Sequence, residues 1–158
     1  LSPRISMSYA LADHWTIKAC PVNGPSVIAK GKQMAAAWFT GANEKGAVYL
    51  AFSDDNGTKW GDPILLNAGN ARGKVDLSLH GENGLAVIWV EIEEKTEFLR
   101  LAEFTFGGNA PVRSAEIQPT GRLHGIPKVQ SKGSDLLVTW PEIDSVPHIE
   151  VALLKANR

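Results

Sequence analysis

Residues 84–91 read GLAVIWVE, and the chain carries two further stretches of this kind, QMAAAWFT at 33–40 and DLLVTWPE at 135–142. Their tryptophans recur at intervals of 51 residues (89 − 38 and 140 − 89), at Trp38, Trp89 and Trp140. Apolar residues flank the tryptophan in every copy, so we expect these side chains to lie in a core between sheets and not to stack on sugars. An internal repeat of this length indicates the architecture more strongly than any local motif.

Each copy consists of short runs of β-branched and aromatic residues separated by Gly, Asn, Asp or Pro. This pattern is typical of strands joined by hairpins. The tryptophan-bearing runs are apolar at successive positions, as expected of a strand that is covered on both faces. We therefore predict an all-β fold, a β-propeller of four-stranded antiparallel blades.

The repeat divides this single propeller module into about three blades, at residues 24–67, 73–117 and 125–158. The third blade is incomplete, and we expect residues 1–13 to form an outer strand that closes it in the same chain or in a partner chain. Closed propellers carry ~4–8 blades, so three do not close a ring. Two chains related by a twofold axis would give a six-bladed ring, which predicts a homodimer; a chain cut from a longer protein is the alternative.

The composition is that of a folded globular protein, with 158 residues of which 44% are hydrophobic and 21% charged. The net charge is -1 and the 16 Lys and Arg are scattered, so neither nucleic acid nor a membrane is an expected partner. No apolar run reaches the ~20 residues of a membrane helix, and the first residues lack the layout of a signal peptide. Cys20 has no second cysteine in the chain, which leaves a buried thiol or a pairing outside the chain. No His or Cys spacing indicates a metal site, and no cofactor is expected.

The stretch SDDNGTKW, which begins at Ser53, follows an apolar run. We predict a tight turn in which Ser53 and Asp55 bond to backbone groups, Gly57 takes a positive φ and Trp60 packs over the corner. A contact with an ion or a sugar is the alternative. The pattern Ser53-x-Asp55-x-Gly57-Thr58-x-Trp60 resembles the Asp-box of the sialidase (bacterial neuraminidase, BNR repeat) superfamily at every defining position.

The resemblance extends over residues 14–142 and is closest to sialidase-like propellers of bacteria, which are generally exported. It implies that the Asp-box is a structural turn on the outer rim, away from the central site. It also implies a periplasmic or extracellular location. Those relatives are longer, with additional blades ahead of Cys20 and a second cysteine there, so the pairing of Cys20 stays open.

Sialidases use a Tyr nucleophile activated by a Glu, an Asp acid/base and three Arg that hold the sugar carboxylate. Tyr9 and Tyr49 are the two tyrosines of this chain, and both are predicted to lie away from the channel. The Arg-Ile-Pro signature of the superfamily is absent. We therefore assign no catalytic residue and do not expect sialidase activity of the ordinary type.

Polar side chains at the starts of the innermost strands and the ends of the tryptophan-bearing strands are predicted to line the channel mouth: Asn23, Arg72, Asp76, Glu91, Arg122, His124 and Glu142. Loops at one face of a rigid scaffold often carry function, so the leading hypothesis is a non-catalytic module that binds a glycan or another polar ligand. The alternative for these residues is solvated loop ends or ion pairs between blades. Glu91 and Glu142 share one repeat position, where the first copy has Thr40, and as general acid and base they would suit a sialidase-like glycoside hydrolase. A purely structural assembly module is the third hypothesis.

Overall fold

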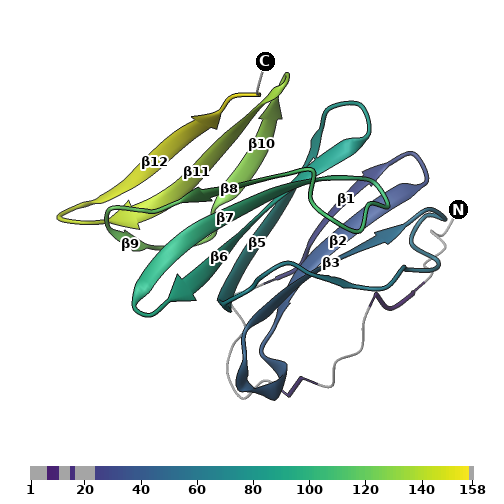
Figure 1. Ribbon diagram of the computed structural model, residues 1–158, viewed down its shortest axis with the longest axis horizontal. Helices are drawn as coiled ribbons and strands as arrows, with labels where there is room; N and C mark the ends of the chain where they lie inside the picture. The colour runs from purple at the N-terminus through teal and green to yellow at the C-terminus, as the bar shows by residue number, and fades with distance from the viewer. Residues whose placement is uncertain (1–6, 11–14, 17–23, 157–158) are drawn as a thin grey trace, which may run out of the picture.

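The structure is a computed structural model that describes residues 7–10, 15–16 and 24–156. These residues form three four-stranded antiparallel sheets, and no α-helix occurs among them. The all-β prediction is therefore confirmed. We number the three sheets along the chain as sheet 1, sheet 2 and sheet 3. Figure 1 shows them side by side in this order.

Sheet 1 has the strand order β1-β2-β3-β4, with β1 (Ser26–Lys30), β2 (Gln33–Thr40), β3 (Ala47–Ser53) and β4 (Ile64–Leu65). A single 3₁₀ turn, η1 (Ala42–Glu44), joins β2 to β3. Sheet 2 has the order β5-β6-β7-β8, with β5 (Asn70–His80), β6 (Gly84–Glu93), β7 (Thr96–Thr105) and β8 (Arg113–Ile117).

Sheet 3 contains β9 (Arg122–Leu123), β10 (Lys128–Lys132), β11 (Asp135–Ile143) and β12 (Pro147–Leu154). Both β9 and β10 pair with β11, so together they occupy the place that the long β5 has in sheet 2. Strand β9 thus comes from residues just ahead of the predicted blade at 125–158, and no described strand pairs with the outer edge of β12, where sheet 2 has β8. Of the predicted outer strand at 1–13, residues 7–10 lie in no strand, and the remainder lies outside the described residues.

The middle sheet packs on both of its neighbours, which explains why its strands are apolar at successive positions. Leu85, Val87 and Trp89 lie in the core shared with sheet 1, which also contains Ala35, Ala37, Val48 and Leu50. Ala86, Ile88 and Val90 lie in the core shared with sheet 3, together with Leu136, Val138 and Trp140. Alternate residues of β6 point to opposite faces, so one strand serves two cores. Trp89 and Trp140 are inter-sheet core residues, as predicted.

Hydrogen bonds from side chains tie the innermost strands of adjacent sheets together. Ser26 Oγ on β1 accepts from the backbone N–H of Leu77 at 3.2 Å. Asp76 Oδ2 on β5 accepts from the backbone N–H of Val129 at 3.1 Å, and Ser78 Oγ accepts from that of Ser131 at the same distance. These bonds satisfy backbone donors that no neighbouring strand can reach, and they hold β1, β5 and β10 side by side.

Candidate functional site

The turn between β3 and β4 is stabilised by its own side chains. Ser53 Oγ accepts from the N–H of Gly57 at 2.9 Å and donates to Asp55 Oδ1 at the same distance. Asp55 Oδ1 also accepts from the N–H of Lys59 at 2.8 Å, and this bond is the main reason that the pKa of Asp55 lies below its ordinary value. Thr58 Oγ1 donates to the carbonyl of Asp55 at 3.0 Å. The Ser and Asp side chains therefore have partners within the turn.

Gly57 and Trp60 complete this corner. Gly57 has a φ of 77°, which an L side chain rarely adopts, and a Cβ there would lie 3.1 Å from Met34 Sδ. The same Cβ would lie 3.6 Å from the Trp60 ring, so the ring lies directly beside the turn. Trp60 Nε1 donates to Ser8 Oγ at 3.3 Å, and Ser8 Oγ in turn donates to the carbonyl of Gly57.

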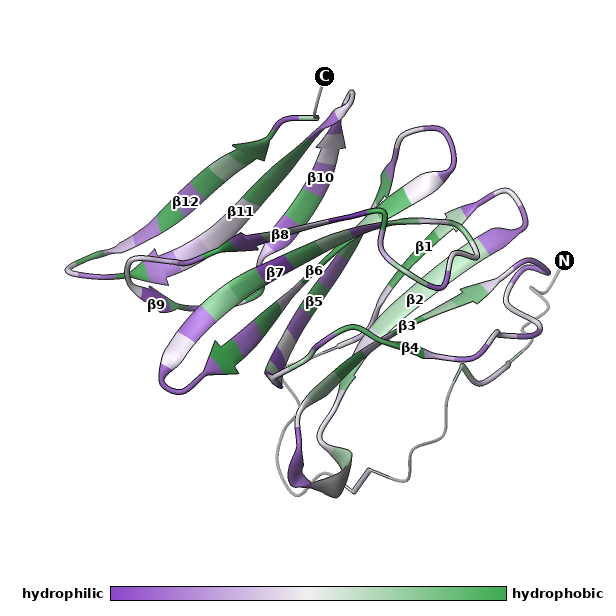
Figure 2. Cartoon of the chain, viewed as in Figure 1, coloured by the Kyte–Doolittle hydropathy of each residue, from purple (hydrophilic) through white to green (hydrophobic). Residues whose placement is uncertain are grey.

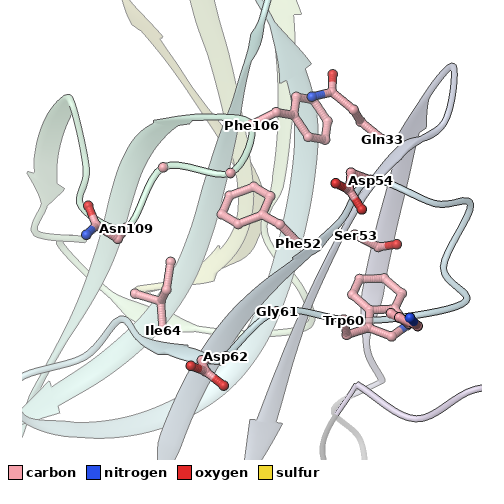
Figure 3. Close-up of a pocket in the computed structure, with 13 residues that line it drawn as sticks. Gln33, Phe52, Ser53, Asp54, Trp60, Gly61, Asp62, Ile64, Phe106 and Asn109 are labelled. Atoms are coloured by element: carbon pink, nitrogen blue, oxygen red, sulfur yellow. The ribbon is translucent and has the colours of Figure 1, made fainter.

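A cavity of about 470 Å³ lies next to this turn, between sheets 1 and 2 (Figure 3). Its wall includes Phe52 and Phe106, whose rings are 6.0 Å apart, and Asp54 and Asp62. Among the residues that the structure describes, no cluster of three or more His, Cys, Asp or Glu could hold a metal ion. The carboxylates here do not form such a cluster.

A larger cavity, of about 820 Å³, lies at the start of β5 and the end of β2. We call it the cationic pocket, after three of its lining residues: Arg72 and Lys74 on β5 and Arg122 on β9. Two carboxylates also line it, Glu97 at the start of β7 and Glu44 at the end of η1. The structure thus brings Arg72 and Arg122, two of the predicted ligand residues, to one cavity.

The positive charges in the cationic pocket are close enough to act on one another. Burial lowers the pKa of Lys74, Glu97 partly offsets this, and the charges of Arg122 and Arg72 lower it further. Lys74 Nζ donates to the carbonyl of Leu123 at 3.3 Å, and Glu97 Oε2 accepts from the N–H of the same residue. An anionic group bound among these cations would reduce their mutual repulsion.

An aromatic pair forms another wall of the cationic pocket. Trp15 and Phe39 pack edge to face, with ring centroids 5.5 Å apart and an interplanar angle of 82°. A Cβ at Gly41 would lie 2.9 Å from the Trp15 ring, so glycine leaves the space that this ring occupies. Flat aromatic surfaces beside charged donors suit a ligand with both apolar and polar faces, as sugars have.

Glu91 and Glu142 are buried and do not line the cationic pocket. Each accepts a hydrogen bond from the indole two residues earlier on its own strand, Trp89 at 2.8 Å and Trp140 at 2.7 Å. Glu91 Oε2 also lies 3.7 Å from Arg100 Nε, so its charge partner is on β7 and is not Arg72 or Arg122. These two carboxylates position the tryptophans.

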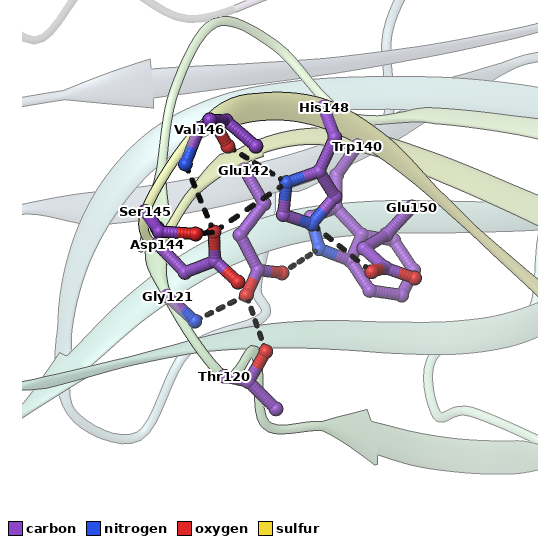
Figure 4. A network of polar contacts seen from close by, with 9 residues as sticks. All are labelled: Thr120, Gly121, Trp140, Glu142, Asp144, Ser145, Val146, His148 and Glu150. Carbon is purple, nitrogen blue, oxygen red and sulfur yellow. Dashed lines mark hydrogen bonds and ion pairs between the residues drawn. The ribbon is translucent and has the colours of Figure 1, made fainter.

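Glu142 is the centre of a network at the end of sheet 3 (Figure 4). Its Oε1 accepts from Thr120 Oγ1 at 2.8 Å and from the N–H of Gly121. Burial alone would raise the pKa of Glu142, but the bonds from Trp140, Thr120 and Gly121 outweigh it and hold the pKa below its ordinary value. A carboxyl that is kept ionised in this way is a poor general acid.

The other predicted ligand residues among those that the structure describes lie outside the cationic pocket. Asp76 is buried between β1, β5 and β10, where it binds the backbone of Val129 and lies 3.2 Å from Lys128 Nζ. His124 and Glu142 line one cavity of about 260 Å³, separate from the cationic pocket, and His124 donates its backbone N–H to the carbonyl of Pro141. Asn23 and Cys20 lie outside the described residues.

Three charged residues that line the cationic pocket, Glu44, Lys74 and Glu97, were not predicted from the sequence. Lys74 follows Gly73 at an irregularity in β5, where both residues have positive φ, of 55° and 75°. Irregularities of this kind in a strand often change the direction of side chains beside functional sites. In the sequence, Gly73 between Arg72 and Lys74 is the feature that could have indicated such an irregularity. Glu97 is brought in by the β6–β7 hairpin, and nothing at its own sequence position indicates this.

No protein family matches the sequence of this chain, and no curated protein does. Within the described parts of the chain, there is also no helix with the length and hydrophobicity needed to cross a bilayer.

Proposed function

We propose that this chain forms three adjacent blades of a sialidase-like β-propeller and binds a glycan or another polar ligand, without catalysis, in the cationic pocket. The sheet arrangement supports the propeller: three four-stranded sheets pack face to face, with their first strands bonded to one another. The Asp-box pattern supports the superfamily. The same resemblance favours a periplasmic or extracellular location.

The observation that carries the binding proposal is the convergence of Arg72, Lys74 and Arg122 on a cavity with an aromatic wall. Guanidinium groups bind carboxylates in a planar, two-pronged fashion, and the aromatic rings offer a surface for the apolar face of a sugar ring. An acidic sugar therefore fits the pocket better than a neutral one. Glu97 is available to accept hydrogen bonds from sugar hydroxyl groups.

Calorimetric titration with N-acetylneuraminic acid and glucuronic acid tests this proposal, with galactose as the neutral comparison. We expect the acidic sugars to bind and galactose to bind more weakly. Arg122→Gln should weaken binding by about tenfold to a hundredfold, because one charged hydrogen-bond donor is lost. Arg113→Gln is the matched control, since Arg113 lies on β8 and pairs with Glu103 outside the cationic pocket. Equal affinity of the Arg122 and Arg113 variants, or no binding of either acid, would reject the site.

The hydrolase alternative has less support. Glu91 and Glu142 each accept from an indole, Glu91 also pairs with Arg100 and Glu142 with the N–H of Gly121, and neither borders the cationic pocket. Absence of product after prolonged incubation with aryl glycosides, in a sample that binds the acidic sugars, would separate binding from hydrolysis.

A further inference from the structure

The face of sheet 3 that points away from sheet 2 is exposed and in part apolar. We call it the outer face of sheet 3; its apolar part lies on β11 and β12 and comprises Leu137, Thr139, Ile149, Val151 and Leu153, while Gln130 and Lys132 of β10 lie on the same face. The side chains of Ile149, Val151 and Leu153 are 64%, 58% and 42% exposed. Figure 2 shows the hydrophobic segments along β12, at the edge of the molecule. A contiguous apolar surface of this kind usually binds something.

The repeat indicates what covers such a face elsewhere in the molecule. Val151 pairs with Thr139, and one repeat earlier Leu101 pairs with Ile88 in the same way. Leu101 is 1% exposed and Ile88 0%, because sheet 3 packs over both. The outer face of sheet 3 therefore corresponds to the surface that, in sheet 2, receives a neighbouring sheet.

The opposite end of the stack has the complementary surface. Val27 pairs with Ala36 on the face of sheet 1 that points away from sheet 2, and it is 53% exposed. At the same repeat position, Leu77 and Val129 are 7% and 4% exposed, because each packs against the preceding sheet. We call this surface, which also includes Trp38, the outer face of sheet 1.

We infer that a second copy of this chain packs the outer face of its sheet 1 on the outer face of sheet 3, and receives the reverse contact in return. Both contacts between the sheets of one chain join these same two kinds of face, so the new contact repeats an arrangement that the fold already uses. Each copy carries both kinds of face, so a second copy offers each outer face the kind of surface that covers it elsewhere in the fold. A reciprocal pair of this kind closes with twofold symmetry.

Trp38 is the residue whose surroundings would change most in this assembly. It is half-buried and stacks on Tyr49 at 5.7 Å, whereas Trp89 and Trp140 are each 5% exposed beneath the preceding sheet. The partner's sheet 3 would cover Trp38 in the same manner. The outer face of sheet 3 also carries the opposed residues Lys132 and Asp135, at the end of β10 and the start of β11, so these charges lie beside the apolar residues of β11 and β12.

This inference rests on the propeller arrangement proposed above and not on ligand binding. Substitution of three exposed valines by lysine tests it. Val151→Lys alters the outer face of sheet 3 and Val27→Lys that of sheet 1, while Val112→Lys changes an equally exposed valine ahead of β8. Size exclusion with light scattering, at several concentrations, should give a particle of twice the chain mass for the unchanged protein and the Val112 variant. The Val151 and Val27 variants should each shift to the mass of one chain.

Mixing the two monomeric variants gives a further test. A Val151→Lys chain retains its outer face of sheet 1 and a Val27→Lys chain its outer face of sheet 3, so one of the two contacts is intact in a mixed pair. The mixture should recover dimer at high concentration. A monomeric unchanged protein, an open series of oligomers, or a dimer that only one of the two variants disrupts would overturn the inference.

Calorimetry with the acidic sugars on the same samples separates the two proposals. The substituted valines do not line the cationic pocket, so a monomeric variant that still binds sugar supports the pocket independently. A dimer that binds no sugar supports the assembly alone. Circular dichroism melting of each variant verifies that the change in mass is not due to unfolding.

Discussion

The indole of Trp140 donates its N–H to Glu142, two residues further along the same face of β11, at 2.7 Å. Trp89 and Glu91 form the equivalent pair on β6 at 2.8 Å. The tryptophan ring fills the space between two sheets while the carboxylate satisfies its one polar atom. This unit repeats with the chain, except in sheet 1, where Thr40 stands at the Glu position.

Glu142→Ala should destabilise the protein by about 2–4 kcal/mol, because the donors of Trp140, Thr120 and Gly121 lose a shared acceptor in a buried position. Urea unfolding followed by tryptophan fluorescence measures the change. Glu82→Ala, in the exposed turn between β5 and β6, is the control and should alter stability little. A loss of similar size in both variants would contradict the role given to Glu142.

The carboxylate of Glu142 also makes the free energy of unfolding depend on pH in the acid range. The pKa of Glu142 is lower in the folded protein than in the unfolded chain, so its stabilising contribution is present above the unfolded-state pKa of about 4.3 and is lost as the pH falls through the folded-state pKa. Asp55, whose pKa is also lowered, acts in the same direction. The free energy of unfolding should therefore decline from about pH 5 downward, and less steeply in Glu142→Gln. Parallel pH profiles for the two proteins would contradict this assignment.

The pKa shift of His148 makes stability depend on pH in the opposite direction. Its Nδ1 bonds to the carbonyl of Val146 at 2.9 Å, and this bond, with the charges of Asp144 and Glu150, raises the pKa of the ring although desolvation opposes it (Figure 4). The stabilising contribution is present below the unfolded-state pKa of about 6.5 and is lost as the pH rises through the folded-state pKa. An NMR titration should place the midpoint of His148 above that value. Asp144→Asn should bring it closer to 6.5, and an unchanged midpoint would exclude the ion pair as a cause.

Gly57→Ala should destabilise the turn between β3 and β4 by about 1–2 kcal/mol, because alanine must adopt a φ of 77° there and its Cβ approaches Met34. Gly61→Ala is a matched control in the same turn, since a Cβ there meets only the Phe52 carbonyl at 3.6 Å. Thermal unfolding of the two variants measures the difference. Equal melting temperatures would show that the turn does not require the glycine.

The periodic elements could be predicted from the sequence, because a repeat constrains many residues at once. The tryptophan-bearing strands lie at β2, β6 and β11, and Gly57 has the positive φ expected of the turn. The split of the first strand of sheet 3 was not predicted. Pro127 has no N–H to donate and Gly125 has a φ of 63°, so pairing with β11 is interrupted between β9 and β10.

The candidate site was predicted less well, because a repeat position does not tell which face of a strand is covered. Glu91 and Glu142 were placed at the channel mouth, yet the period of two along a strand puts each on the face of its buried tryptophan. Arg72 and Arg122 could be predicted from their place at the start of a strand. Lys74 and Glu97 depend on an irregular strand and a hairpin register, which single-sequence reasoning does not resolve.

The sharing of β6 between two cores has a consequence for how the molecule opens. Among the described sheets, only sheet 2 is covered on both faces, while sheets 1 and 3 each contact one neighbour. Stability in such a stack is set by nearest-neighbour contacts, so the end sheets should detach before the middle one. Amide protons of β6, at Val87 and Ile88, should accordingly outlast those of β1 and β12 in deuterium exchange, and pairing with a second chain would slow exchange at the two ends.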